Sequence, residues 1–112
     1  MSTPTRQITL RRRPMGWVTL KDFEIRETIL QVPNSGHVLI RAIYMSLDPY
    51  MRGRMDAAKT YAQNFQIGEP LKARVIGEVV RSEHANFNAG DLVHGMVDWA
   101  DMSVAQGADL RH

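Results

Sequence analysis

The stretch from His37 to Met55 constrains the fold of this chain more than any other. Residues 37–45 form an apolar-rich run interrupted only by Arg41, which predicts a β-strand buried on both faces. Asp48 and Pro49 follow, and this pair is typical of a helix start, because Asp can accept from the free amide groups of a first turn and Pro needs no acceptor there. We therefore predict a buried strand that ends in a tight corner and a helical turn.

Short alternating runs elsewhere predict further strands. In residues 7–13, Ile8 and Leu10 are expected to face the core, and Gln7 and Thr9 are expected to face solvent. Residues 1–5 are polar and are expected to fray. Further strands are expected over 22–30, 73–82, 92–97 and 99–104, with turn-rich sequence between several of them.

This spacing of short strands predicts a mainly β domain, either a small barrel or a sandwich, with short helical turns. Gly77 lies inside an expected strand, which marks a bulge or a close approach of another backbone. Residues 56–66 show no firm pattern, and a loop of this length invites a functional explanation.

Length and composition exclude several classes of protein. The 112 residues suffice for one domain with a single core, and the absence of cysteine excludes disulfides, thiolate catalysis and Cys-based zinc sites. A net charge of +2 is weak evidence for a polyanion partner, so no nucleic acid is expected. The sequence shows no run of membrane-spanning length and no signal-peptide core, so we expect a soluble cytoplasmic protein without a membrane partner.

The corner also carries a family resemblance. The motif Ser-Leu-Asp-Pro-Tyr-Met-Arg-Gly-Arg-Met at residues 46–55 resembles the signature of zinc-independent medium-chain reductases, in the leukotriene B4 12-hydroxydehydrogenase, prostaglandin reductase and curcumin reductase group. The resemblance extends through residues 90–93 and Trp99. It implies a GroES-like, partly open β-barrel, with residues 1–112 as the N-terminal domain of such a reductase and the family's nucleotide-binding domain absent.

The resemblance further implies an activity. Members of this group use NADPH to reduce the C=C bond of α,β-unsaturated ketones and aldehydes. The implied partners are a small enone substrate and the missing Rossmann domain, and a homodimer is left open. We expect these 112 residues alone to be inactive and to self-associate through the surface that a partner domain would cover.

The glycines support the view that the dinucleotide site lies elsewhere. They stand at 16, 36, 53, 68, 77, 90, 95 and 107, and no two are separated by one residue. The Gly-x-Gly-x-x-Gly fingerprint, which grips a pyrophosphate at a helix N-terminus, is therefore missing. NADPH is expected to bind mainly through the missing domain.

The candidate site residues surround the corner. Tyr50 is the catalytic candidate, because a phenol can hold a carbonyl oxygen or a ribose hydroxyl. The resemblance implies that Tyr50, Tyr61 and Trp99 contact substrate and that Met45, Asp48 and Tyr50 contact cofactor. Structural alternatives stay open: Tyr50 and Trp99 as packing aromatics, and Asp48 as a helix cap.

Metal binding is not expected. The positions that hold zinc ligands in zinc-dependent relatives correspond to Met45, Ala73 and Arg74, none of which suits zinc. The histidines lack the spacing of a metal motif and are expected at the surface or in strands; they are His37, His84, His94 and His112. Arg52 is expected to pair with Asp56 or Glu69.

A non-enzymatic function is the alternative. A small β-barrel can also serve as a stand-alone binding or assembly module. The sequence that follows His112 in the gene distinguishes the two hypotheses, because a glycine-rich βαβ unit there would support the enzyme and a stop codon would support the module.

Overall fold

The computed structural model describes residues 3–31, 33–48, 50–56 and 65–112. The strands are β1 (Thr3–Leu10), β2 (Phe23–Leu30), β3 (His37–Met45), β4 (Lys72–Ser82), β5 (Leu92–Asp98), β6 (Met102–Gln106) and β7 (Leu110–Arg111). The short helical elements are η1 (Leu20–Asp22), α1 (Tyr50–Gly53) and η2 (Gly107–Asp109). None of the described helices is long and apolar enough to cross a membrane.

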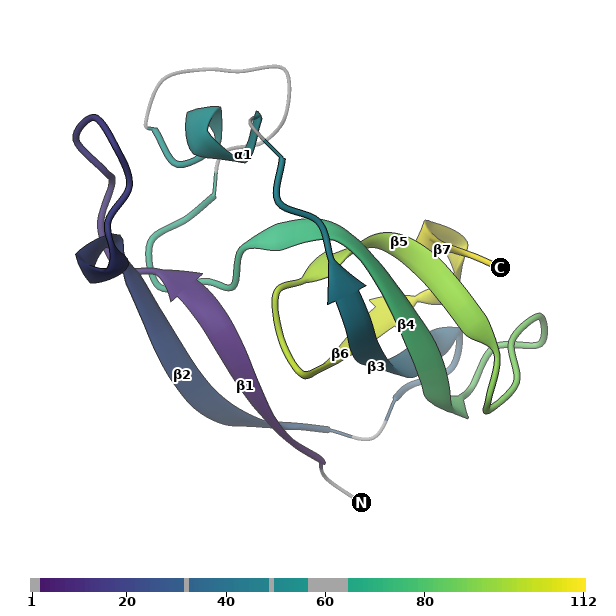
Figure 1. Ribbon diagram of the computed structural model, residues 1–112. Helices are drawn as coiled ribbons and strands as arrows, with labels where there is room; N and C mark the ends of the chain where they lie inside the picture. The colour runs from purple at the N-terminus through teal and green to yellow at the C-terminus, as the bar shows by residue number, and fades with distance from the viewer. Residues whose placement is uncertain (1–2, 32, 49, 57–64) are drawn as a thin grey trace.

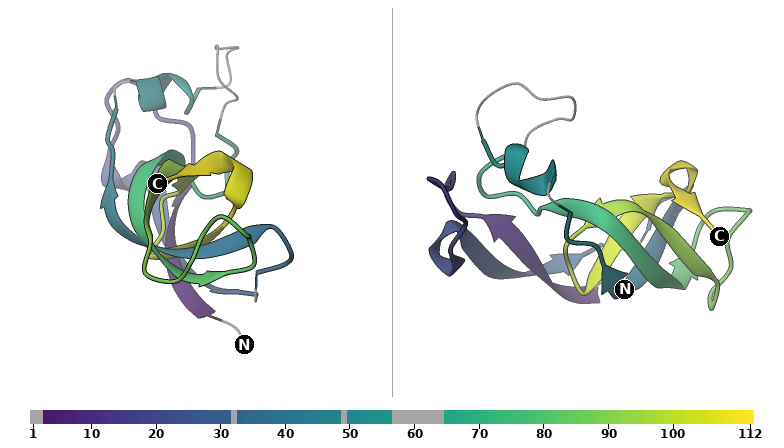
Figure 2. Two further views of the ribbon diagram at one scale, coloured as in Figure 1. Left: turned by 90° about the vertical axis from the view of Figure 1, so that its right-hand side faces the viewer. Right: turned by 45° about the horizontal axis from the view of Figure 1, so that its top comes forward.

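The strands form two antiparallel sheets (Figure 1). β1 pairs with β2, while the larger sheet has the strand order β6-β3-β4-β5-β7 and curls around its own core, as the end-on view in Figure 2 shows. Isolated bridges from Gln7 to Ala100 and from Thr9 to Pro70 join β1 to connections that flank strands of the larger sheet. The mainly β fold predicted from the strand pattern is confirmed, and so is the partly open barrel that the family resemblance implies.

The main core lies inside the curled sheet. The inward side chains of β4 alternate with outward ones, as the predicted strand over 73–82 requires. They meet side chains from the neighbouring strands in one cluster of Val38, Ile40, Val75, Val79, Phe87, Val93, Val97, Ala105 and Leu110. Gly77 lies at the predicted close approach, because a Cβ atom there would stand 2.8 Å from the carbonyl oxygen of Arg41.

Burial of β3 on both faces is wrong for the second half of the strand. Val38, Leu39 and Ile40 are buried, but Tyr44 is 69% exposed. β6 pairs with β3 only from His37 to Arg41, so the later residues have β4 alone as a neighbouring strand. The apolar run therefore indicated a strand correctly but overstated its burial.

The first strand differs from the prediction in its bounds and in its buried face. β1 runs from Thr3 to Leu10, so it begins within the residues expected to fray. Gln7 and Thr9, which were expected to face solvent, are both buried. β1 also lies between other segments of the chain: Thr9 Oγ1 donates to the Glu24 carbonyl at 3.2 Å, and the other edge of β1 bridges to Ala100 and Pro70.

The last predicted strand begins later than expected. Residues 99–101 form a turn between β5 and β6, and β6 starts at Met102. The turn residues bind other segments of the chain: the Trp99 amide donates to Leu71 at 2.7 Å, and the Asp101 amide donates to Arg6 at 3.0 Å. The strands expected over 22–30 and 92–97 are confirmed within one residue, and most of 56–66 lies outside the described residues.

A second cluster lies beneath α1. Its members are Leu10, Met51, Met55, Phe65, Leu71 and Ala73, and Ile8, Phe23 and Trp99 pack against it; we call it the α1 cluster. α1 begins at Tyr50, where the Asp48–Pro49 pair predicted a helix start, and the Met51 amide donates to the Asp48 carbonyl at 3.0 Å. The helical turn is therefore anchored by apolar packing under the corner.

Candidate functional site

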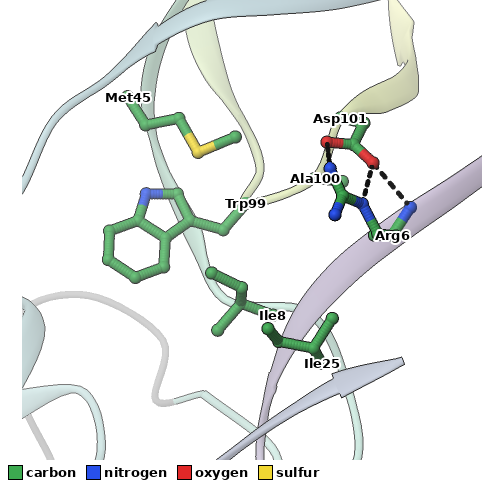
Figure 3. A pocket seen from close by; sticks show the side chains of 7 residues that line it. All are labelled: Arg6, Ile8, Ile25, Met45, Trp99, Ala100 and Asp101. Carbon is green, nitrogen blue, oxygen red and sulfur yellow. Dashed lines mark hydrogen bonds and ion pairs between the residues drawn. The ribbon is translucent and has the colours of Figure 1, made fainter. Parts of the chain in front are cut away.

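A cavity of about 230 Å³ opens where β1, β2, the end of β3 and the turn 99–101 meet (Figure 3). Its walls are mostly apolar, with one pair of charged residues at the rim. The lining residues are Arg6, Ile8, Ile25, Met45, Trp99, Ala100 and Asp101. Pockets for drug-sized ligands span roughly 300–1,000 Å³, so this cavity suits a small molecule or one end of a longer molecule.

Met45 and Trp99 lie together in this cavity, although they were predicted from separate parts of the sequence. Met45 is the last residue of β3. Trp99 is held at both backbone groups, because its amide donates to Leu71 at 2.7 Å and its carbonyl accepts from the Ile8 amide at 2.8 Å. Its indole ring also packs against the α1 cluster. The tryptophan therefore has a stiff support that connects the cavity to the packing beneath α1.

The indole nitrogen of Trp99 is buried and has no hydrogen-bond partner among the described residues. Figure 3 shows the nitrogen-bearing edge of the ring turned toward Met45. Because most buried polar groups in native proteins are paired, this donor is a feature of the site and not a routine packing detail.

The charged groups at the rim neutralise each other. Arg6 Nε donates to Asp101 Oδ2 at 2.8 Å, and Arg6 Nη2 donates to Asp101 Oδ1 at 3.3 Å. The hydrogen bond from Arg6 holds the pKa of the Asp101 carboxyl below its usual range, and the same pairing raises the pKa of Arg6. Both residues therefore stay ionised and paired at neutral pH.

Of the other predicted site residues, only Asp48 can be placed in full. It is half-buried at the corner and is not among the residues that line the cavity. The backbone of Tyr50 begins α1, but its side chain lies outside the described part of the structure, as does all of Tyr61. The roles proposed for both tyrosines stay predictions.

The three zinc-ligand positions do lie close together. Met45 pairs with Val75 in the β3–β4 register, and the Ser46 amide donates to the Arg74 carbonyl at 2.8 Å. Ala73 is fully buried in the α1 cluster. The three positions are therefore neighbours along the backbone, but the side chains of Ala73 and Arg74 face opposite sides of β4, and thioether, methyl and guanidinium groups are not a zinc ligand set.

The histidines also lack metal-site geometry in the part of the chain that the structure describes. No group of three or more His, Cys, Asp or Glu side chains there could hold a metal ion. His84 and His112 instead flank Phe87, with ring centroids 5.2 Å and 4.7 Å from it. The prediction that no metal binds awaits elemental analysis.

The described residues do not form a dinucleotide site. Their sheets are antiparallel, and α1 has only four residues. A Rossmann site needs parallel strands and a helix N-terminus that faces the pyrophosphate. The cavity is also too small for a whole dinucleotide. The described residues therefore form neither a Rossmann unit nor a cavity that could enclose a whole dinucleotide.

Arg6, Ile8, Ile25 and Asp101 were missed as cavity residues. The alternation around Ile8 indicated only that it faces inward, and no local pattern connects residue 6 with residue 101. Their juxtaposition comes from the backbone pairing of β1 with the turn 99–101. Arg52 pairs with Asp56 at 2.7 Å, as expected.

Comparison with known proteins identifies the family. The sequence profile of a family described as the N-terminal domain of oxidoreductase matches residues 6–112. The chain belongs to this family. This oxidoreductase N-terminal domain is 38% identical over 111 residues to the putative NADP-dependent oxidoreductase YfmJ of Bacillus subtilis, covering 99% of this chain and 32% of that protein.

The NADPH-dependent curcumin reductase of Escherichia coli is 37% identical over 105 residues, covering 94% of this chain and 30% of the enzyme. Among solved structures, CurA from Vibrio vulnificus superposes with a TM-score of 0.87 and 39% identity, covering 92% of this chain and 30% of that one. CurA has also been solved in complex with NADPH.

These matches confirm the resemblance to zinc-independent medium-chain reductases that the motif at residues 46–55 indicated. They also show that this chain is much shorter than its relatives. The oxidoreductase N-terminal domain described here spans about 30% of the length of these relatives, so the activity of a whole protein requires a separate proposal.

Proposed function

We propose that residues 1–112 are the substrate-side domain of a longer NADPH-dependent reductase that acts on the C=C bond of α,β-unsaturated ketones and aldehydes. The observation that carries this proposal is the shared cavity of Met45 and Trp99. It is apolar, it lies at the end of β3, and it connects through Trp99 to the cluster beneath α1. A conjugated carbonyl compound has a flat apolar body that such walls accommodate.

The chemistry needs two things from this domain. The nicotinamide, held mainly by sequence outside these residues, would supply the hydride to the β-carbon, and the resulting enolate would take up a proton from water at the α-carbon. The protein must then hold the substrate in an apolar pocket and place a hydrogen-bond donor at the carbonyl oxygen, where negative charge develops. Tyr50, at the first position of α1, is our candidate for that donor, and Tyr61 is the second candidate.

The comparisons support the proposal without extending to substrate identity. The E. coli relative is a curcumin reductase, and curcumin is itself a conjugated diketone. Support for the cofactor comes from the NADP-dependent names of the relatives and the NADPH complex of CurA. The substrate of this protein is to be found by experiment.

The test uses the full-length protein expressed from the gene, including whatever follows His112. We expect purified protein with NADPH and 4-phenyl-3-buten-2-one to consume NADPH, followed by loss of nicotinamide absorbance, and to yield the saturated ketone. Residues 1–112 expressed alone should be inactive, because their sequence lacks the Gly-x-Gly-x-x-Gly fingerprint. A full-length protein that reduces neither this ketone nor a panel of 2-alkenals would refute the proposal.

A further inference from the structure

The unpaired indole N–H of Trp99 is the strongest unexplained feature of the cavity. The nitrogen is buried, and no acceptor within the described ranges reaches it. A buried donor without an acceptor loses its hydration and gains nothing in return. Because this N–H group lies at a candidate site, we expect its acceptor on a bound ligand and not among the described residues.

Neighbouring side chains do not supply that acceptor. Met45 lies at the nitrogen-bearing edge of the indole (Figure 3), but it makes no hydrogen bond to the nitrogen, and a thioether is a weak acceptor in any case. The Asp101 carboxylate is occupied by Arg6, through both of its oxygens. The donor is therefore unpaired among the described residues, but it is buried, so a ligand can reach it only after a covering group moves.

We propose that Trp99 Nε1–H donates a hydrogen bond to a neutral carbonyl oxygen of a ligand whose apolar part fills this cavity. The identification of the ligand as an enone rests on the proposed reductase function; the existence of the donor does not. Trp99 is then a specificity-determining residue, because its N–H stabilises bound ligands that place an oxygen atom at one point in an otherwise apolar pocket.

Met45 must move for this bond to form. Its side chain is unbranched with three rotatable bonds, and it is 38% exposed, so an alternative rotamer costs little. In contrast, Trp99 is held at both backbone groups and packs against the α1 cluster. The Met45 side chain can therefore change rotamer and uncover the indole nitrogen. The Trp99 ring stays in place as the hydrogen-bond donor.

The cavity also selects for the charge and size of the ligand. Arg6 and Asp101 satisfy each other at the rim, so neither a carboxylate nor an ammonium group finds an unpaired counter-charge there. Ile8 and Ile25 provide apolar walls. With a volume of about 230 Å³ the site takes a small neutral ketone or aldehyde, or the apolar end of a longer one.

A pair of ligands that differ only at the oxygen tests the inference. The probes are 4-phenyl-3-buten-2-one and 1-phenyl-1-butene, in which a methylene replaces the carbonyl. Each is titrated into ¹⁵N-labelled full-length protein with NADP⁺ present, so that no hydride is available. The indole signal lost in Trp99→Phe identifies Trp99, and the signal lost in Trp17→Phe identifies the exposed Trp17 as an internal control.

We expect the ketone, and not the hydrocarbon, to move the Trp99 indole proton downfield, while the Trp17 signal stays in place. One ordinary hydrogen bond corresponds to about tenfold in affinity, so the preference for ketone over hydrocarbon should fall about tenfold in Trp99→Phe. Met45→Ala should leave the fold intact and speed exchange of the Trp99 indole proton with water, which gives a second measurement if Trp99→Phe does not fold.

The outcomes separate this inference from the proposed function. Reduction of the ketone without a ketone-specific shift of the Trp99 signal would overturn the inference and leave the reductase standing. A ketone-specific shift without any reduction would reject the reductase and confirm the binding site. Equal shifts with both probes would show that the indole senses packing alone, which also overturns the inference.

Discussion

The guanidinium group of Arg13 donates a 2.8 Å hydrogen bond to the carbonyl oxygen of Met55, which joins the β1–η1 connection to the segment after α1. The same nitrogen contacts the carbonyl oxygens of Asp56 at 3.2 Å and Phe65 at 3.1 Å. One arginine thus holds the chain on both sides of residues 57–64.

Arg52 makes the reciprocal connection. From α1 it donates to the carbonyl oxygens of Pro14 and Gly16, at 3.1 Å each, and it pairs with Asp56 at 2.7 Å. Two arginines therefore cross between the same two segments in opposite directions. The placement of α1, which begins at Tyr50, depends on these contacts as well as on the apolar cluster beneath it.

Replacement of Arg13 by lysine should destabilise the protein. A lysine keeps the charge but carries a compact ammonium group in place of the planar guanidinium group. It therefore cannot donate hydrogen bonds to the same three carbonyl oxygens with the same geometry. We expect a loss of about 1–3 kcal/mol in the free energy of unfolding, measured by urea denaturation. Arg11→Lys, at an exposed position of the same connection, is the control and should be nearly neutral.

Asp22 should make folding stability sensitive to acid. Its buried carboxylate accepts from Arg12 Nε at 2.7 Å and from the Thr19 amide at 2.8 Å, and chiefly the Arg12 bond lowers its pKa below the ordinary 3.8. A carboxyl with a lowered pKa stabilises the fold above pH 3.8, and this contribution is lost as the pH falls through the folded-state pKa.

The corresponding experiment compares unfolding free energies across that range. In wild-type protein the free energy should fall more steeply below pH 3.8 than in Asp22→Asn, which cannot titrate. Glu24→Gln, at a neighbouring exposed carboxylate, should retain the wild-type slope. Parallel curves for wild type and Asp22→Asn would show that the buried pair does not contribute to acid sensitivity.

Alanine at position 77 should strain the sheet. The new methyl group would stand 2.8 Å from the Arg41 carbonyl oxygen, closer than real Cβ atoms are found, and that oxygen belongs to the backbone of the paired strand β3. We expect Gly77→Ala to cost about 1–3 kcal/mol, measured by thermal and urea unfolding. Val80→Ala, at an exposed position of the same strand, should cost less; equal losses would argue against the close approach.

Removal of the Tyr50 hydroxyl should slow the proposed reaction in the full-length enzyme. If the phenol donates mainly when charge develops on the substrate oxygen, Tyr50→Phe lowers kcat by up to about 10²-fold without unfolding the protein. Tyr44→Phe, at an exposed position on β3, is the matched control and should leave kcat unchanged.

The alternative for Tyr50 is a packing role, and it has a different kinetic signature. In that case Tyr50→Phe would be nearly neutral, and Tyr50→Ala would raise KM through lost contacts. An unchanged kcat/KM for Tyr50→Phe would exclude Tyr50 from the chemistry and shift attention to Tyr61.

Local patterns determined the elements and the family. The β-rich composition of residues 73–82, the Asp48–Pro49 helix start and the glycine inside β4 each predicted a feature that the structure contains. The motif at residues 46–55 indicated the reductase family before any comparison. These features depend on backbone preferences and on near neighbours in sequence, so they can be predicted from short segments.

Long-range pairing decided what is buried and what meets. Gln7 and Thr9 are buried on a strand that also bridges to Ala100 and Pro70, whereas Tyr44 is exposed beyond the point where β6 stops pairing with β3. The cavity exists because the end of β3 and the turn 99–101 converge on β1, which places the Met45 thioether beside an indole N–H without an acceptor. Such relationships depend on the pairing of strands that are distant in the sequence, so a single short segment does not reveal them.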